Sequence, residues 1–166
     1  FICLLAVSSG SRDCDAGFPV LATKLASLGV DTLSIAQIDG SGLPGNYATP
    51  SAIASLMRGF AKRPDWPRWR EALPIMGVDG SVATVQQGSP AAGHVFAKTG
   101  TLVDGDLLNG RLRVATKALG GYIQAKSGRW LAIAIIANQA MYPDIYGLFA
   151  ANEDVGRIAS AIWETY

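Results

Sequence analysis

The stretch HVFAKTGTLVDGD, residues 94 to 106, carries the clearest indication of fold and chemistry in this chain. Its apolar start is typical of a β-strand, and an acidic turn that contains glycine follows. Between them lie Lys98, Thr99, Gly100 and Thr101, which place a cation, two hydroxyls and a glycine side by side. Such a group suits an anion, so we expect this strand edge to hold a peptide that bears a carboxylate.

Each of these residues has a part in that hypothesis. An extended peptide gains main-chain hydrogen bonds along an exposed strand edge. Lys98 supplies a positive potential that holds a terminal carboxylate or lowers the pKa of a neighbouring base, and Thr99 and Thr101 offer hydroxyl donors. Gly100 lets the backbone approach a ligand, and the N–H beyond it can stabilise an oxyanion. Alone the tripeptide is a weak signal, because chance produces it in roughly a few per cent of such chains.

The remaining patterns predict helices around an antiparallel sheet. Thr49 and Pro50 are typical of a helix start, and Gly29 of a helix end. The sequence Lys126-Ser127-Gly128-Arg129 indicates the turn of a β-hairpin. Periodicity predicts helices at 1–8, 18–30, 49–62 and 144–166, and strands at 32–38, 94–102, 122–125 and 130–137. We therefore expect an α+β fold in which an antiparallel sheet is flanked by helices.

Composition excludes several classes of protein. The chain has 166 residues, 49% apolar and 16% charged, which is enough for a substantial core. Its net charge is +1 and its basic residues are scattered, so we expect no nucleic-acid partner. The most apolar run, Trp130 to Ala137, is shorter than the roughly 20 residues that span a bilayer, so no transmembrane segment is expected. The opening FICLLAV lacks a basic leader and resembles the middle of a buried helix, so we expect further sequence upstream.

The cysteines leave two interpretations open. Cys3, Cys14 and the single histidine, His94, are too few ligands for a zinc site, so no metal is expected. The cysteines are either two buried thiols or a disulfide that closes a short loop, and a disulfide needs an oxidising compartment. His94 is expected at the surface or edge of its strand, because no partner acid or nucleophile is marked near it.

Some conspicuous residues have plain structural explanations. Asp39 and Asp79 each precede a glycine, and such pairs usually form turns through the aspartate side chain. Trp66 and Trp69 lie in a proline-containing stretch that looks irregular, with about one turn of helix. We expect both indoles to serve packing and not sugar stacking.

The strand HVFAKTGTL and several other segments occur in a recognisable order. They are GVDTLSIAQIDGSGLPGNYATPSAIASLM, LPIMGVDGSVA, HVFAKTGTL and the hairpin GGYIQAKSGRWLAIAIIAN. Together, over roughly residues 18 to 140, they resemble the C-terminal half of a penicillin-binding protein, more narrowly the D-Ala-D-Ala carboxypeptidase/endopeptidase family, the low-molecular-mass class C enzymes. The resemblance implies the serine β-lactamase/penicillin-binding transpeptidase-like fold and a serine acyl-transferase without cofactors.

The same resemblance implies that the nucleophile lies elsewhere. In this family a Ser-x-x-Lys motif supplies the nucleophile and its base, and the present sequence contains none. We therefore expect residues 1–166 to be the C-terminal part of a single penicillin-binding domain, with the nucleophile-bearing N-terminal part as its missing partner. Residues 103–119 are longer than in a compact member of the family and are expected to lengthen the rim of the site.

The middle Ser-x-Asn motif of the family falls on Pro44-Gly45-Asn46. The resemblance assigns Asn46 to the substrate amide, alongside Lys98 and Thr99 as catalytic residues. Pro44 has no hydroxyl and cannot relay a proton, so Ser41 is the nearest substitute. This departure keeps a second hypothesis open, a catalytically impaired binding or scaffold module of the cell envelope.

The implied activity is removal of the terminal D-Ala from peptidoglycan stem peptides through an acyl-enzyme, with acylation by β-lactams. A β-lactamase of the same fold is a third hypothesis. The implied location is extracytoplasmic, in the cell envelope or secreted, and an exported protein favours the Cys3–Cys14 disulfide.

Overall fold

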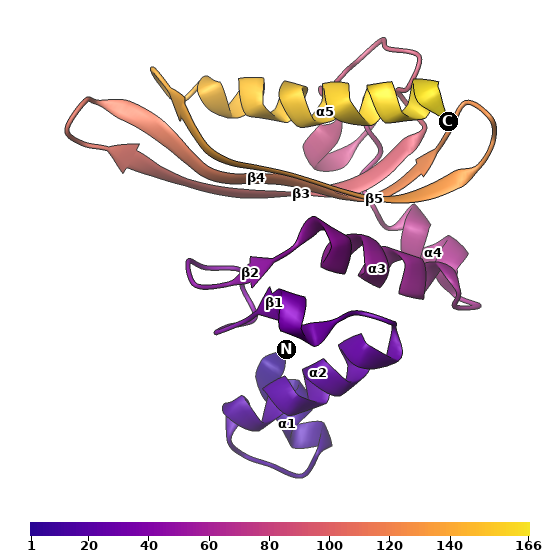
Figure 1. Cartoon of the computed structure of the whole chain (residues 1–166), viewed down its shortest axis with the longest axis vertical. Helices are drawn as coiled ribbons and strands as arrows, with labels where there is room; N and C mark the ends of the chain where they lie inside the picture. Colours follow the sequence, from indigo (N-terminus) through magenta and orange to yellow (C-terminus); the bar gives the residue numbers. More distant parts are fainter. The chain divides into compact units, whose positions relative to one another are not determined.

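The computed structural model describes all residues from Phe1 to Tyr166, and they divide into two compact units, Phe1–Lys62 and Arg63–Tyr166 (Figure 1). The first unit contains α1 (Ile2–Ser8), the 3₁₀ turn η1 (Cys14–Ala16), α2 (Gly17–Ser27), η2 (Thr32–Ser34), β1 (Ile35–Ala36), β2 (Tyr47–Ala48) and α3 (Pro50–Ala61). The second contains α4 (Trp66–Glu71), η3 (Gly80–Val82), β3 (Val95–Asp106), β4 (Arg111–Gln124), β5 (Trp130–Tyr142) and α5 (Gly147–Thr165). The predicted α+β class, with an antiparallel sheet and helices, is confirmed.

The helix boundaries of the first unit follow local chemistry. The Thr49 hydroxyl accepts a hydrogen bond of 3.1 Å from the N–H of Ala52, and Pro50 occupies the first turn of α3, as predicted. Gly29 follows the end of α2 with φ +80°, the left-handed conformation that glycine adopts at little cost. In α1, which is helical as predicted, only Ala6 is buried, so the expectation of a buried helix is wrong for its other residues.

The strand predicted at residues 32–38 is mostly wrong. Only Ile35 and Ala36 are extended, and they pair with β2. The Asp31 carboxylate accepts a hydrogen bond of 3.0 Å from the N–H of Leu33 and caps η2 there. A side chain that bonds its own backbone two residues on favours a turn over a strand, which explains why the alternating pattern did not extend.

The second unit is built on one antiparallel sheet with the strand order β3-β4-β5. Helix α5 runs along one face of this sheet (Figure 1). Between the sheet and α5 lies a continuous apolar core. It contains Met76, Val82, Val85, Ala91, Val95, Ala97, Leu119, Ile123, Ile133, Val155 and Ala159. Residues at every second position of β4, such as Leu119 and Ile123, enter this core because side chains alternate across a strand.

Residues 103–119, which were expected to lengthen the rim of the site, are part of the sheet itself. They continue β3 and β4 into one long hairpin, which turns at residues 107–110. Ion pairs between Asp104 and Arg113 and between Asp106 and Arg111 join the two strands beyond a bulge at Leu102. Opposite charges on neighbouring strands favour this pairing, and the sequence analysis did not recognise the matching positions.

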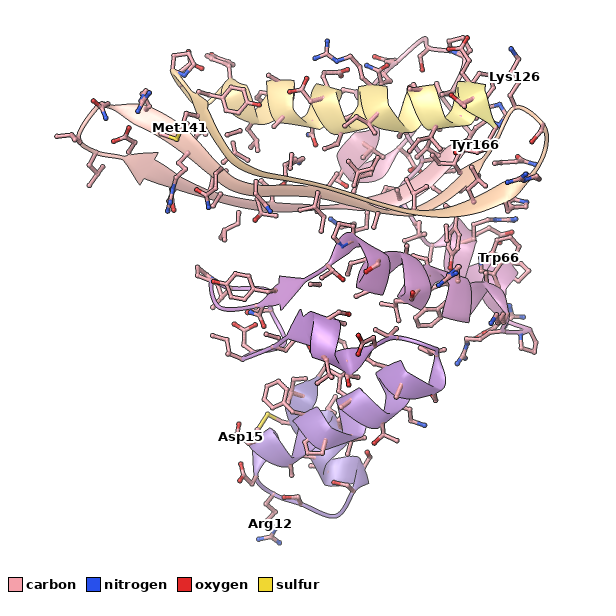
Figure 2. All side chains as sticks on the ribbon, in the orientation of Figure 1. Arg12, Asp15, Trp66, Lys126, Met141 and Tyr166 are labelled. Atoms are coloured by element: carbon pink, nitrogen blue, oxygen red, sulfur yellow. A yellow bond between two sulfur atoms is a disulfide. The ribbon has the colours of Figure 1, made fainter.

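An aromatic cluster closes the other end of the sheet, as the packing interpretation of Trp66 predicted. The Trp66 ring meets Tyr122 and Trp130 edge to face, with ring centroids 5.6 and 5.4 Å apart. The guanidinium of Arg70, one turn further along α4, lies 4.8 Å from the centre of the Trp130 ring. Figure 2 shows Trp66 among the side chains of this region.

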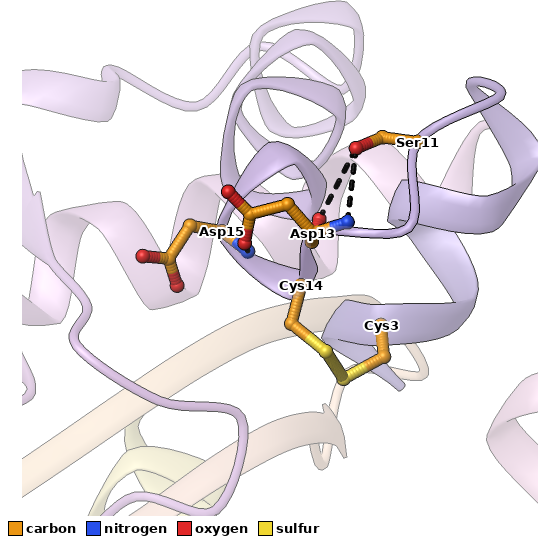
Figure 3. Close-up of a disulfide and its surroundings, with 5 residues drawn as sticks. All are labelled: Cys3, Ser11, Asp13, Cys14 and Asp15. Atoms are coloured by element: carbon orange, nitrogen blue, oxygen red, sulfur yellow. Dashed lines mark hydrogen bonds between the residues drawn. A yellow bond between two sulfur atoms is a disulfide. The ribbon is translucent and has the colours of Figure 1, made fainter.

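A disulfide joins Cys3 in α1 to Cys14 in η1 (Figure 3). The loop between the two cysteines is held by short-range hydrogen bonds. The N–H of Asp13 donates to the Ser11 hydroxyl at 3.1 Å, and the Asp13 carboxylate accepts from the N–H of Asp15 at 3.1 Å. The structure thus contains the disulfide and not the pair of buried thiols.

None of the helices combines the length and the hydropathy that crossing a bilayer requires.

Candidate functional site

Strand β3 lies at the edge of the sheet, and only the start of that edge is covered within its unit. The N–H of Met76 donates to the carbonyl of Val95, and the N–H of Ala97 donates to the carbonyl of Pro74, both at 2.9 Å. The segment from Pro74 to Met76 therefore pairs with the outer edge of β3 like a short additional strand. This pairing extends along β3 only as far as Ala97. Beyond it, from Lys98 onward, no backbone of this unit pairs with the outer edge of β3.

The direction of the backbone groups follows from these contacts. Ala97 donates outward, away from β4, and peptide groups alternate in direction along a strand. The N–H and C=O groups of Thr99 and Thr101 therefore also point to the open edge. An extended peptide can pair with this edge by strand addition. The N–H of Thr101, the residue after Gly100, is one of the donors that it would meet.

Lys98 is exposed and carries the positive charge of this edge. Its ammonium donates a hydrogen bond of 2.9 Å to the carbonyl oxygen of Thr99. No carboxylate forms an ion pair with it. An unpaired cation next to outward-pointing backbone donors is suited to a carboxylate ligand.

Thr99 contacts a residue that the sequence analysis did not single out. Its hydroxyl donates to the hydroxyl of Ser81 at 3.1 Å, from the turn η3. Nearby, the Asp79 carboxylate accepts a hydrogen bond of 2.7 Å from the N–H of Ile75, so its side chain closes the turn before it, instead of capping η3, the predicted turn that follows. The turn closed by Asp79 connects the segment that pairs with the first residues of β3 to η3, which carries Ser81. The sequence motif LPIMGVDGSVA contains these residues. This motif was the feature of the sequence that could have indicated Ser81.

Packing within the protein does not require glycine at position 100. A Cβ there would lie 3.6 Å from the Cβ of Ala118, an ordinary van der Waals contact. By contrast, a Cβ at Gly121 on the neighbouring strand would lie 2.1 Å from the carbonyl oxygen of Phe96. Gly121 is therefore a packing requirement. An exposed glycine that packing does not require is consistent with close approach of a ligand.

Thr101 faces a buried lysine across the sheet. Lys117 stands directly opposite it on β4, and its ammonium donates to the Thr101 hydroxyl at 2.7 Å. Lys117 is only 2% exposed. Burial, followed by the charge of Lys98, lowers the pKa of Lys117 below its ordinary value. Lys117 was not predicted as a site residue, because residues 111–119 were not expected to form a strand. In β4, alternation places Lys117 on the same face as Leu119 and Ile123, which lie in the core.

The remaining predicted residues belong to the first unit. Ser41 is exposed, and its N–H donates to the Asp39 carboxylate at 2.8 Å. This contact, the largest cause, together with bonds from Gly42 and Asn46, holds the pKa of Asp39 below its ordinary value. The turn predicted at Asp39 is confirmed by these bonds.

Asn46 is fully engaged in the same loop. Its amide nitrogen donates to the Asp39 carboxylate at 2.9 Å and to the carbonyl of Leu43 at 2.7 Å. Its amide oxygen accepts from the N–H groups of Ile38 and Asp39, at 3.0 and 3.4 Å. A side-chain amide has two donors and two lone pairs, so no capacity remains for a substrate amide. The geometry therefore favours a structural role for Asn46 over the predicted catalytic one.

The structure thus brings Lys98, Thr99, Gly100 and Thr101 together on one open edge, with Ser81 and Lys117 beside them. It places His94 at the start of this strand, where its ring stacks on Trp163 with centroids 5.7 Å apart. That position agrees with the expected edge location of His94 and gives it a packing partner.

The fold of this chain is similar to that of solved penicillin-binding structures. Penicillin-binding protein 4 (DacB) from Haemophilus influenzae has a similar structure, with a TM-score of 0.67 and 22% identity over 88% of this chain and 32% of that one. A predatory endopeptidase from Bdellovibrio bacteriovorus is also similar, with a TM-score of 0.56 and 22% identity over 89% of this chain and 36% of that one. The penicillin-binding fold is confirmed.

The chain belongs to the D-Ala-D-Ala carboxypeptidase 3 (S13) family, whose model matches residues 6–147. It is 33% identical over 137 residues to a D-alanyl-D-alanine carboxypeptidase from Actinomadura sp. (strain R39). It is 32% identical over 125 residues to carboxypeptidase DacB from Mycolicibacterium smegmatis. These matches cover 79% and 71% of this chain but only 23% and 25% of the two relatives, so the chain spans about a quarter of their length.

Proposed function

We propose that this chain forms the carboxylate-binding part of a serine-type D-Ala-D-Ala carboxypeptidase. The enzyme would remove the terminal D-Ala of peptidoglycan stem peptides through an acyl-enzyme and would be acylated by β-lactams. The observation that carries the proposal is the open edge of β3, which begins at Lys98 and presents an unpaired ammonium beside threonine hydroxyls. Family membership and the relatives' names support the reaction.

In this proposal the end of the stem peptide lies extended along β3. The ammonium of Lys98 and the hydroxyl of Thr101 bind its terminal carboxylate. The outward N–H of Thr101 donates to the carbonyl oxygen of the scissile bond and stabilises the negative charge that develops there. The absence of a side chain at Gly100 lets the two backbones approach.

The covalent step needs a serine that residues 1–166 do not supply as Ser-x-x-Lys. We propose that this serine lies in the N-terminal part of the same penicillin-binding domain. Its hydroxyl oxygen bonds to the substrate carbonyl carbon while its proton passes to a neighbouring base. Collapse of the intermediate breaks the amide bond, and the protonated D-Ala leaves. Water then attacks the ester and regenerates the serine.

The location follows from substrate and redox chemistry. Peptidoglycan stem peptides lie outside the cytoplasm, and a Cys3–Cys14 disulfide persists in an oxidising compartment. We therefore propose an extracytoplasmic protein, in the cell envelope or secreted.

The test is labelling of the intact gene product with a fluorescent penicillin, followed by peptide mass mapping and an assay of D-Ala release. We expect an adduct on a serine outside residues 1–166 and release of D-Ala from a D-Ala-D-Ala peptide. The variant Lys98→Ala should lose most labelling. The matched control Lys126→Ala removes an exposed lysine of the β4–β5 turn and should label like the wild type.

The other outcomes separate the alternatives. No adduct with no β-lactam consumed contradicts the proposal and favours a binding module of the cell envelope. Rapid hydrolysis of the β-lactam without a stable adduct contradicts it in favour of a β-lactamase.

A further inference from the structure

The second unit buries a lysine that has no acidic partner. Lys117 is 2% exposed, and no aspartate or glutamate forms an ion pair with it. The Thr101 hydroxyl, at 2.7 Å, is its hydrogen-bond acceptor. A buried cation without a counter-charge is unfavourable and is uncommon unless function requires it.

The hydrogen bond fixes the direction in which Thr101 can donate. A threonine hydroxyl has one proton and two lone pairs, and the Lys117 ammonium occupies a lone pair because it can only donate. The Thr101 proton must therefore point to some other acceptor. Thr101 is exposed at the open edge of β3, so its proton is available to a ligand there.

Charge points to the same ligand. The ammonium of Lys98 donates to the carbonyl oxygen of Thr99, two residues before Thr101, and after burial its charge contributes to the lowered pKa of Lys117. Neither lysine has a carboxylate of this protein as a partner. The region around Thr101 therefore holds two positive charges that an incoming anion would neutralise.

We propose that Lys117 is a positioning residue for the terminal carboxylate of the substrate. Its ammonium holds the Thr101 oxygen, so the Thr101 proton is directed to the carboxylate, and its charge strengthens that contact. Lys117 acts through Thr101 and, because it is buried, does not touch the substrate. This inference rests on the proposed function.

The experiment uses the full-length enzyme and a pair of substrates. One is a peptide ending in D-Ala-D-Ala with a free carboxylate, and the other is the same peptide ending in a carboxamide. The variants are Lys117→Met, which removes the charge at similar length, Lys117→Arg, which keeps it, and the exposed control Lys126→Met (Figure 2). The ratio of kcat/KM for the two peptides measures recognition of the carboxylate alone.

We expect Lys117→Met to lower kcat/KM about tenfold for the carboxylate peptide, mainly through KM, and to leave the carboxamide peptide nearly unchanged. Lys117→Arg should restore most of the difference, and Lys126→Met should match the wild type. In a Thr101→Val background, Lys117→Met should have little further effect, because the route through the hydroxyl is gone.

Suppose that the wild type cleaves the carboxylate peptide. If Lys117→Met then lowers kcat/KM equally for both peptides, or for neither, the role of Lys117 is overturned and the proposed function is not. A wild type that cleaves neither peptide overturns the proposed function and this inference with it.

Discussion

The side-chain amide of Asn46 donates a hydrogen bond of 2.9 Å to the carboxylate of Asp39, and together they close the loop that carries Ser41. The variant Asn46→Ala should therefore lower the free energy of unfolding, by about 0.5–1.5 kcal/mol, because it removes hydrogen bonds that hold this partly exposed loop. Urea unfolding checks this. The double variant with Asp39→Ala should lose less than the sum of the single losses. A fully stable Asn46→Ala protein with lost activity would restore the catalytic interpretation.

The Asp39 carboxylate should make stability depend on acid. Hydrogen bonds, that of the Ser41 N–H first, hold its pKa in the folded protein below the ordinary value of 3.8. The unfolded chain therefore takes up the proton first as pH falls. The stabilisation is present above pH 3.8 and is lost as pH falls through the folded pKa. Urea unfolding of wild type and Asp39→Asn between pH 2 and 6 should show a flatter profile for the variant. Parallel profiles would contradict this account.

Gly100 and Gly121 should respond in opposite ways to the same substitution. Gly100→Ala should leave the free energy of unfolding within about 0.5 kcal/mol, because its Cβ meets Ala118 at 3.6 Å. It should lower the rate of acylation by penicillin about tenfold or more, because the ligand loses its close approach. Gly121→Ala should destabilise by about 3 kcal/mol, since its Cβ overlaps the Phe96 carbonyl. Denaturation and acylation kinetics on both variants test this, and an unchanged acylation rate for Gly100→Ala would remove Gly100 from the site.

The disulfide should stabilise the first unit. Replacing Cys3 and Cys14 together with alanine should lower its free energy of unfolding by about 2–3 kcal/mol, because a closed loop restricts the unfolded chain. The wild type should become less stable on addition of dithiothreitol, and the double variant should not respond. A wild type whose unfolding is indifferent to the reductant would show that the disulfide does not form in solution.

Lys117 should destabilise the folded protein near neutral pH. Its pKa in the folded protein is lowered from 10.5, so the unfolded chain binds the proton more tightly. The resulting destabilisation of the folded state is fully present below the folded pKa. It fades as pH rises through the folded pKa towards 10.5. Lys117→Met should therefore be more stable than the wild type at pH 7, by about 1–2 kcal/mol, and the difference should shrink by pH 10. Lys126→Met should show no such change, and a destabilised Lys117→Met would contradict the prediction.

The site was only partly accessible to sequence reasoning. Lys98, Thr99, Gly100 and Thr101 are contiguous, so a strand that contains them brings them together without further information. Asn46 was assigned a catalytic role from its position in the motif. That position gives no information on the hydrogen bonds within the loop, which occupy every donor and acceptor of the Asn46 side chain. Local spacing also predicted too long a strand at 32–38, because it did not include the cap supplied by Asp31.

The sequence by itself determined the helices with strong caps, such as α3 at Thr49, the hairpin turn at Lys126, and the chemistry of the Lys98 edge, since each depends on neighbours in the chain. Tertiary structure decided that Lys117 is buried and meets Thr101, because that face of β4 is covered only in the folded protein and the register of β3 and β4 sets the two residues opposite each other. It also decided where the edge opens, because the covering segment at Pro74 is distant in sequence. Contacts between distant residues arise from pairing and packing, which no local pattern contains.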